Sequence, residues 1–295
     1  MKIRISTLAA LLGPTLFVFA CGGGNSTTPP SAGTVSGTVV KGPVSGASVV
    51  AFAITSVAMG PQVGGGTTDS MGNFTISIGD YAGPMMLQAS GGSYTDEATG
   101  TSMTMGTGDV MACAIPSVAA GATTTGIQIT PVTSMAHSRV HYMTGGITAP
   151  NITTANTAIG AYFSVGDILH TVPMNSMVAG SGTGASQDAK NYGMTIAAMS
   201  QYAMSIGMPY SSGIVTAMMD DASDGVMDGM MGSTSISMGG MGGMMGGMMQ
   251  ANAGTTGLAT AMTTFVGSAM NKSGVAMSEM QTLVNKLNTS TGTIQ

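Results

Sequence analysis

Charged residues are scarce in this sequence. They make up 6% of its 295 residues, against roughly 25% in ordinary soluble domains. The 7 Lys and Arg residues stand far apart along the chain and are outnumbered by 12 Asp and Glu residues. They cannot form the basic surface that binds a phosphate backbone, so we expect no nucleic-acid partner.

Cysteine is nearly absent as well, and its two positions are Cys21 and Cys113. If Cys21 is modified, as argued below, Cys113 has no partner within the chain, and packing alone must stabilise the fold. Cys113 lies in an apolar segment. We therefore expect a small buried hydrophobic residue rather than a reactive thiol.

Long apolar runs and catalytic motifs are also missing. After residue 20, Gly, Ser and Thr interrupt every apolar run well before the ~20 residues that a transmembrane helix needs. The chain has no G-x-S-x-G elbow, Walker loop or dinucleotide-binding fingerprint. Its two Glu and three His residues are too dispersed to unite a nucleophile, a base and an orienting group. We therefore expect that the protein is not an enzyme.

What is present begins with the features of an export signal in residues 1–20. Lys2 and Arg4 make the start positive, and an apolar run from Leu8 to Phe19 follows. A run of this length is typical of a signal peptide and too short for a stable membrane span. We expect residues 1–20 to be removed on export.

Residues 18–21, Val-Phe-Ala-Cys, resemble the lipobox of bacterial lipoproteins. Phe19 departs from the small residue which that family prefers at this position. The resemblance implies cleavage before Cys21 and several acyl chains on that cysteine, enough to hold the protein on a bilayer. Gly22 is not the Asp that retains such proteins at the inner membrane, so the resemblance implies the outer membrane of the cell envelope. The alternative is an ordinary secretory leader in which Cys21 is incidental.

Residues 21–33 are dominated by Gly, Ser, Thr and Pro. Such a composition gives a solvated, flexible tether rather than a packed element. We expect this tether to hold the folded part of the chain clear of the lipid headgroups.

Short β-rich runs separated by turn signals occupy residues 34–115. The runs are Thr34–Lys41, Ala47–Ile54, Asn73–Ile78, Met85–Ala89 and Val110–Ala114. Between them, Gly, Pro, Asp and Asn mark turns at 42–46, 69–73 and 91–92. This spacing predicts a β-sandwich rather than βαβ units.

Residues 35–39, 42–49 and 68–76 resemble the carboxypeptidase regulatory-like, or prealbumin-like, domain. The resemblance implies a β-sandwich from a family that supplies spacers and binding modules and carries no catalytic residues. A likeness of fold does not assign a function. We expect the adjacent Asp96 and Glu97 to lie in a solvated loop, because no basic or nucleophilic residue is near them in sequence.

From residue 116 onward the apolar residues recur with a helical period. The predicted helices run from Pro131 to about Met143, from Asn151 to Phe163, from Ser186 to Gly207, and over 212–222, 257–271 and 279–288. Thr130, Asn151 and Ser186 are the predicted N-caps of the first three, and Ser278 with Gln281 predicts a capping box for the last. We therefore expect a mostly α-helical domain over 116–295, packed through Met, Ala, Ile and Leu, and an α+β chain overall.

One acidic segment has part of the pattern of a calcium-binding loop. Asp220, Asp224 and Asp228 fall at loop positions 1, 5 and 9, and Gly225 falls at position 6. The bidentate Glu that closes such loops is absent, because Met231 stands at position 12. Calcium bound weakly by these carboxylates is one hypothesis. The other is a helix-ending turn in which Asp and Gly serve the backbone.

Methionine and glycine dominate residues 230–249. The candidate thioether ligands are Met238, Met241, Met244, Met245, Met248 and Met249. Thioethers suit copper in its Cu(I) state. A disordered low-complexity loop and a scavenger of oxidants are the alternatives that this composition also allows.

His137 and His141 are four residues apart in a predicted helix and share one face, where they could hold a metal. The Glu of a zinc protease is missing between them. Two histidines alone make an open, weak site, so partly exposed helix residues are the simpler interpretation.

These observations favour a membrane-anchored cell-envelope lipoprotein that works as a structural or binding module. Its partners would be the lipid bilayer, through Cys21, and other envelope or surface proteins. The alternative is an envelope metal-handling protein that uses the Met-rich segment for copper or the Asp loop for calcium. No other cofactor is expected.

Overall fold

Alternating apolar residues form the strands in the first part of the chain. The computed structural model describes residues 32–55, 57–238 and 247–295. In β4, Asn73–Gly79, the side chains of Phe74, Ile76 and Ile78 are buried and those between them are exposed. The other strands are β1 Gly33–Val39, β2 Ser48–Thr55, β3 Ala58–Thr67, β5 Gly83–Ser90, β6 Ser93–Thr95, β7 Ser102–Thr104, β8 Val110–Val118 and β9 Thr123–Ile129.

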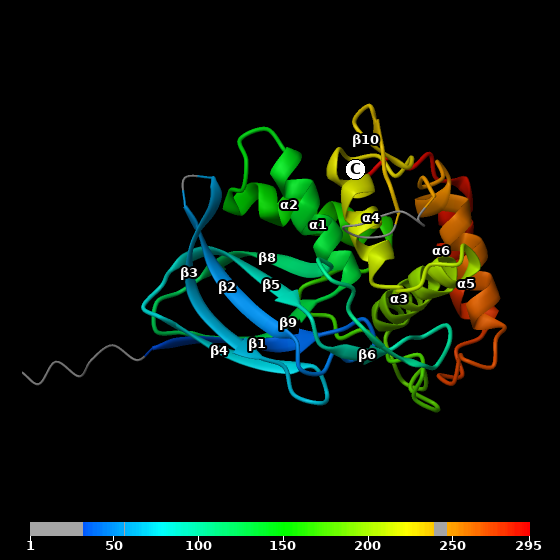
Figure 1. Ribbon diagram of the computed structural model, residues 1–295, viewed down its shortest axis with the longest axis horizontal. Helices are drawn as coiled ribbons and strands as arrows, with labels where there is room; N and C mark the ends of the chain where they lie inside the picture. The colour runs from blue at the N-terminus through cyan, green and yellow to red at the C-terminus, as the bar shows by residue number, and fades with distance from the viewer. Residues whose placement is uncertain (1–31, 56, 239–246) are drawn as a thin grey trace, which may run out of the picture. The chain divides into compact units, whose positions relative to one another are not determined.

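Two sheets pack face to face (Figure 1). One has the strand order β4-β1-β9 and the other β3-β2-β5-β8, and β6 and β7 form a separate hairpin. Strand β1 is antiparallel to β4 and parallel to β9. Buried residues from both sheets, among them Val35, Ile76 and Leu87, belong to one hydrophobic core.

Glycine is required where β1 and β9 approach each other. A Cβ atom on Gly37 would lie 1.8 Å from the carbonyl oxygen of Ile127. The register between β1 and β9 shifts between Val35 and Gly37. A side chain at residue 37 would therefore force the two strands apart and break the sheet.

Helices follow from residue 131 to the C-terminus. They are α1 Pro131–Tyr142, α2 Ala149–Tyr162, α3 Gln187–Ser205, α4 Gly213–Ser223, the π-helical turn η1 Ala253–Gly257, α5 Leu258–Val266 and α6 Met277–Thr289. The chain is thus α+β, with N-terminal sheets followed by a mostly α-helical region, as the sequence predicts. Between α4 and η1, two short strands, β10 Met230–Met231 and β11 Thr234–Ser235, pair with each other.

Two of the predicted helix starts are wrong. Thr148 caps α2, because its hydroxyl accepts from the backbone N–H of Asn151, which itself lies inside the helix. Ala276 occupies the cap position of α6, and its backbone N–H donates to Glu279 three residues later. The predicted caps Thr130 and Ser186 are confirmed, since each accepts from the backbone three residues ahead.

Helices α1 and α2 cover the outer face of the four-stranded sheet, which makes a third layer (Figure 1). Ile54, Met86 and Ala114 of the sheet pack there against Val140 of α1 and Ile152 of α2. The hydroxyl of Ser134 in α1 accepts from the backbone N–H of Ala112 in β8. The first two helices are therefore attached directly to the sheet.

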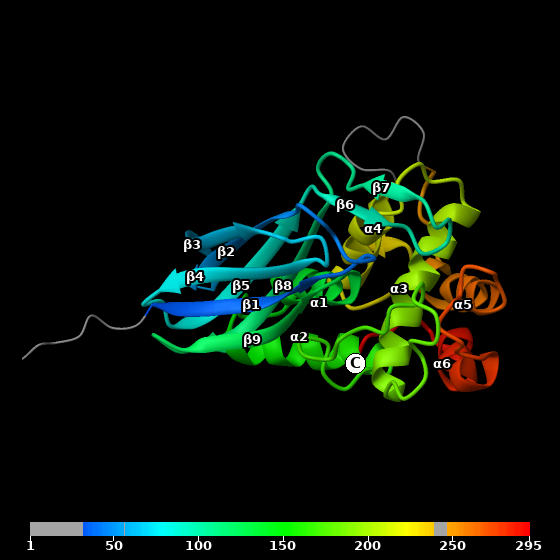
Figure 2. The ribbon, with the colours of Figure 1, turned by 90° about the horizontal axis from the view of Figure 1, so that it is seen from below.

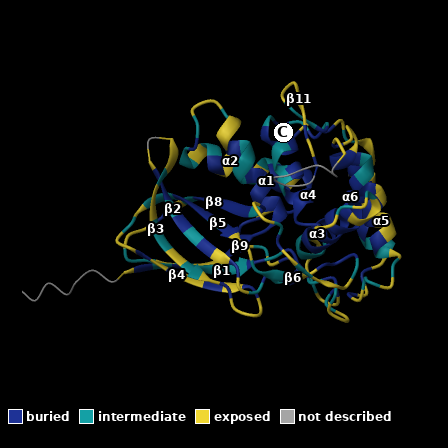
Figure 3. Cartoon of the chain, in the orientation of Figure 1, coloured by how far each residue is buried: buried dark blue, intermediate teal, exposed yellow. Residues whose placement is uncertain are grey.

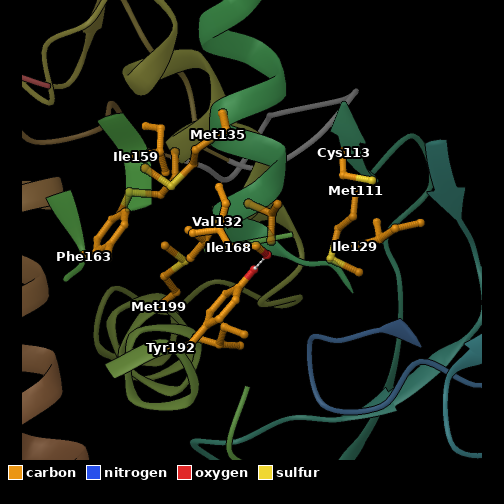
Figure 4. Packing of buried hydrophobic residues seen from close by; sticks show 14 of the residues in the cluster. Met111, Cys113, Ile129, Val132, Met135, Ile159, Phe163, Ile168, Tyr192 and Met199 are labelled. Carbon is orange, nitrogen blue, oxygen red and sulfur yellow. Dashed lines mark hydrogen bonds between the residues drawn. The ribbon is translucent and has the colours of Figure 1, made fainter. Parts of the chain in front are cut away.

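The sheets and the helices share a continuous core. Met111 and Cys113 of β8, Val132 of α1 and Tyr192 of α3 belong to one hydrophobic cluster (Figure 4). Figure 3 shows the buried residues continuing from the sheets into α1, α3 and α4. Residues 31–295 form one structural unit. The boundary expected at residue 115 falls inside β8, and the sheets continue to the end of β9.

Cys113 is fully buried, as expected of a small apolar residue. Burial raises the pKa of its thiol to about 12. In the described part of the chain, no helix is both long and apolar enough to cross a membrane.

Candidate functional site

Lys41 lies just after β1 and has no exposed surface. Its Nζ atom is 3.2 Å from Oε2 of Glu97 and 3.7 Å from Oδ2 of Asp96. Its ammonium also lies 5.2 Å from the centre of the Tyr94 ring. One buried cation therefore faces two buried carboxylates, an arrangement that survives only when every charge is paired or hydrogen-bonded.

Asp96 and Glu97 lie in the turn between β6 and β7 and are only 1% and 4% exposed. The expectation that they form a solvated loop is wrong. Oδ1 of Asp96 accepts from the backbone N–H groups of Ala98 and Thr99, and Oε1 of Glu97 accepts from the backbone of Gly42. Their cationic partner is 55 residues or more away along the chain, so inspection of the neighbouring sequence could not find it.

Two serines from the helical region complete this buried ion network of Lys41, Asp96, Glu97, Ser200 and Ser211. Lys41 donates to the hydroxyls of Ser200 in α3 and Ser211 before α4, the latter at 3.1 Å. Ser200 in turn donates to Glu97 at 2.5 Å, and Ser211 donates to Asp96. The network thereby joins the β6–β7 hairpin to α3 and α4, beside which the hairpin lies in Figure 2.

The network favours the ionised forms of Lys41 and Asp96. Burial by itself would lower the pKa of Lys41, but the neighbouring carboxylates, Glu97 first, outweigh it and the pKa is raised. Burial would likewise raise the pKa of Asp96, but the Lys41 ammonium and the Ser211 hydroxyl hold it below its usual value. Lys41 therefore stays protonated at neutral pH and cannot act as a base toward either serine.

A pocket of about 290 Å³ opens beside the network. Glu97 belongs to the network and also lines the pocket. Its walls are Thr38, Val40, Gly42, Pro43, Met71, Asn73, Glu97, Val172, Pro173, Met174, Asn175, Ser176, Gly193 and Ile196. Most of this surface is apolar, and Met71 and Val172 at its rim are 64% and 62% exposed. The hydroxyl oxygen of Ser176 is buried and has no hydrogen-bond partner within the described residues.

Local backbone features position both walls of the pocket. On one side, the carboxylate of Asp69 accepts from the backbone of Met71 and Asn73 and so closes the turn before β4. On the other side, Gly193 of α3 lies so close to the loop 172–176 that a Cβ atom there would be 1.9 Å from the carbonyl oxygen of Met174. The pocket is therefore built into the fold before any ligand binds.

The three carboxylates of the predicted calcium loop do not converge. The two oxygens of Asp224 accept from the backbone of Val226 and Gly232, Asp228 accepts from Met230, and Asp220 lies on α4. Among the described residues, no group of three or more His, Cys, Asp and Glu side chains is placed to hold a metal ion. The bonds made by Asp224 and Asp228 are those of a helix-ending turn.

Asp221 is the acidic residue of this segment that sequence reasoning missed. Its side chain is fully buried, and Oδ1 accepts from the backbone of Asp228 and Gly229 at 2.9 Å and 2.6 Å. Its second oxygen has no hydrogen-bond partner in the described part of the chain. Burial raises the pKa of Asp221 to about 7.

The Met-rich segment is described only at its two ends. Met238 and Met249 are buried in the core, and Met248 is exposed. The backbone of Met238 pairs with Gly247, and that of Met249 with Ile236. Met241, Met244 and Met245 lie outside the described residues. The buried thioethers of Met238 and Met249 fill the core and do not face solvent.

The structure brings His137 and His141 together on α1, with their Nε2 atoms 3.2 Å apart. His170 lies elsewhere and binds Asp167 at 2.8 Å. Cys21 and the tether up to residue 31 fall outside the described residues.

Comparison with known proteins does not assign this chain to a family. No family model matches the chain, and no curated protein matches its sequence. Among solved structures, a 9R-lipoxygenase from Cyanothece PCC8801 aligns with a TM-score of 0.23 and 11% identity, over 36% of this chain and 17% of that one. An alignment of this quality and extent says nothing about function here.

Proposed function

We propose that this protein is a non-catalytic binding module of the cell envelope, anchored by lipid on Cys21, and that the pocket beside the ion network receives its ligand. The ligand is a small, mainly apolar molecule. The preformed pocket with its mainly apolar lining carries this proposal. Concave sites of this kind bind small molecules by removing apolar surface from water.

The lining of the pocket supports an uncharged ligand. Glu97 is the charged residue of the wall, but both of its oxygens already accept hydrogen bonds, from Gly42 and from Lys41 and Ser200. A cationic ligand would have to compete with these hydrogen bonds for the Glu97 carboxylate. The surrounding Met, Val, Pro and Ile side chains favour apolar surface instead.

The state of the nearby serines supports binding over catalysis. Ser200 and Ser211 each accept a hydrogen bond from Lys41 and donate one to a carboxylate. A nucleophilic serine needs a base that can take its proton. In this network the nearest amine is already protonated and paired, so the serines serve as structural links.

The pocket is tested with matched tryptophan variants and a neutral apolar fluorophore, N-phenylnaphthylamine. Val172 lines the pocket, whereas Val178 on the same segment is also exposed and lies outside it. We expect the unmodified protein to bind the probe saturably, Val172→Trp to weaken that binding at least tenfold by filling the pocket, and Val178→Trp to leave it unchanged. Equal binding by all three proteins would exclude the pocket as the binding site.

The anchor is tested independently of the pocket. We expect mass spectrometry to find an acylated Cys21 at the mature N-terminus, and Cys21→Ser to release the protein from the membrane fraction. An unmodified N-terminus on soluble mature protein would overturn the lipid anchor and leave the binding pocket standing.

A further inference from the structure

His137 and His141 form a second candidate site, on a different layer of the molecule from the pocket. They are one turn apart on α1, and their rings meet edge to face, with centroids 4.7 Å apart and an interplanar angle of 75°. Their Nε2 atoms converge to 3.2 Å. His141 is exposed at the helix surface, so the point between the two nitrogens is reached from solvent.

The cation nearest to the pair in sequence does not oppose a bound metal ion. Arg139 lies between the two histidines, but its guanidinium donates to the carbonyl oxygen of Ser223 at 3.2 Å and so turns toward α4. The neutral imidazole nitrogen is the form that binds metals.

We propose that His137 and His141 chelate one divalent transition-metal ion through their two Nε2 atoms, with Cu²⁺ bound most tightly. Two nitrogens that bind one ion at about 2.0–2.1 Å lie about 3.3–3.4 Å apart at a tetrahedral centre and about 2.8–3.0 Å apart at a square-planar one. The observed 3.2 Å falls between the two. Two histidines at this helical spacing are also the pair by which zinc proteases hold their metal.

Metal binding requires a change of histidine tautomer, and no proton has to leave the protein. In the metal-free chain, one ring donates its Nε2 proton to the Nε2 lone pair of the other. Metal binding needs both lone pairs, so the donor ring takes the tautomer that carries its proton on Nδ1. The Nδ1 atom of His137 is buried with no partner among the described residues. This limits the affinity, and water fills the remaining coordination positions.

Cu²⁺ titration of the tag-free full-length protein, followed by electron paramagnetic resonance, tests the site. We expect one bound Cu²⁺ with hyperfine coupling from two imidazole nitrogens. His141→Ala should weaken binding at least tenfold and remove the two-nitrogen signature. The matched control is His170→Ala, which removes the one other histidine of the chain and should change neither.

His141→Gln provides a second variant that retains a polar side chain of similar size on the exposed face of α1. Circular dichroism of each variant shows whether α1 is intact. If folded His141→Gln and His141→Ala bind Cu²⁺ as tightly as the parent protein, or if the copper spectrum shows sulfur ligands, the histidine site is wrong.

Discussion

Lys41 shows how a single buried charge can tie distant segments together. Its ammonium contacts carboxylates from the β6–β7 turn and hydroxyls from two helical segments. Removing one partner of such a buried pair typically costs about 3–5 kcal/mol, because an unpaired charge is left behind. The fold therefore depends on residues that are far apart in sequence and that belong to no local sequence motif.

The buried carboxyl group of Asp221 makes the stability of the fold depend on pH. Its pKa is raised from 3.8 to about 7 in the folded protein, so between these values the folded state holds a proton that the unfolded state has lost. The contribution of Asp221 to stability is therefore fully present below pH 4 and is lost as the pH rises through 7.

We expect Asp221→Asn to remove this pH dependence, because the amide stays neutral and its oxygen can still accept from Asp228 and Gly229. Urea unfolding at pH 4.5 and pH 8 measures the effect. The stability of the variant relative to the parent protein should rise by about 1–3 kcal/mol between these values. An unchanged difference at both pH values would show that Asp221 titrates normally.

At the scale of elements, α3 positions both halves of the candidate site. Ser200 on this helix contacts Glu97 of the ion network, while Gly193 and Ile196 line the pocket. Every residue of α3 from Asn191 to Ala203 is buried. A helix surrounded on all sides holds its side chains in fixed positions, which suits a preformed pocket.

Gly193→Ala is predicted to destabilise the protein by about 2 kcal/mol or more, since its Cβ atom would overlap the backbone of Met174. It should also weaken probe binding, because the loop 172–176 must move. Thermal or urea unfolding measures the first effect and probe fluorescence the second. Gly267→Ala is the control, since a Cβ atom there has no neighbour nearer than 3.7 Å. Equal stability of the two variants would contradict the close contact.

At the scale of the whole molecule, the sheets and the helices share one core, so the N-terminal sheets depend on the rest of the chain to fold. Strand β9, which follows residue 115, pairs with β1, and helices α1 and α2 cover the outer sheet face. A fragment that ends at residue 115 would expose both surfaces and leave Lys41 without its serine partners. Each of these losses opposes folding.

We therefore expect a fragment of residues 32–115 not to fold on its own. Circular dichroism and amide dispersion in proton NMR measure this directly. The matched control is residues 32–295, which contains the complete core. A cooperative unfolding transition of the shorter fragment would show that the first sheets form an independent domain.

Local pattern alone predicts much of the fold. Alternation at Phe74, Ile76 and Ile78 predicts β4, and the helical period with Thr130 and Ser186 as caps predicts α1 and α3. The caps of α2 and α6 are mispredicted because several nearby residues can accept the same backbone bond, and only the path of the chain chooses among them. Strand β4 and the starts of α1 and α3 depend on neighbours within a few residues, so the sequence predicts them correctly.

The candidate site was decided by tertiary structure. Lys41, Asp96 and Ser211 carry no local motif, and burial makes them partners because unpaired charges are costly in the interior. The pocket likewise exists only where the turn at 69–73 meets the loop 172–176. The i,i+4 spacing of His137 and His141 is readable in sequence, whereas the 3.2 Å approach of their nitrogens needed the packed helix. Sequence by itself predicted many of the elements and the lipid anchor, since both are read from contiguous residues, but it missed strands β3, β6, β7 and β9. Long-range packing determined every site that the elements assemble.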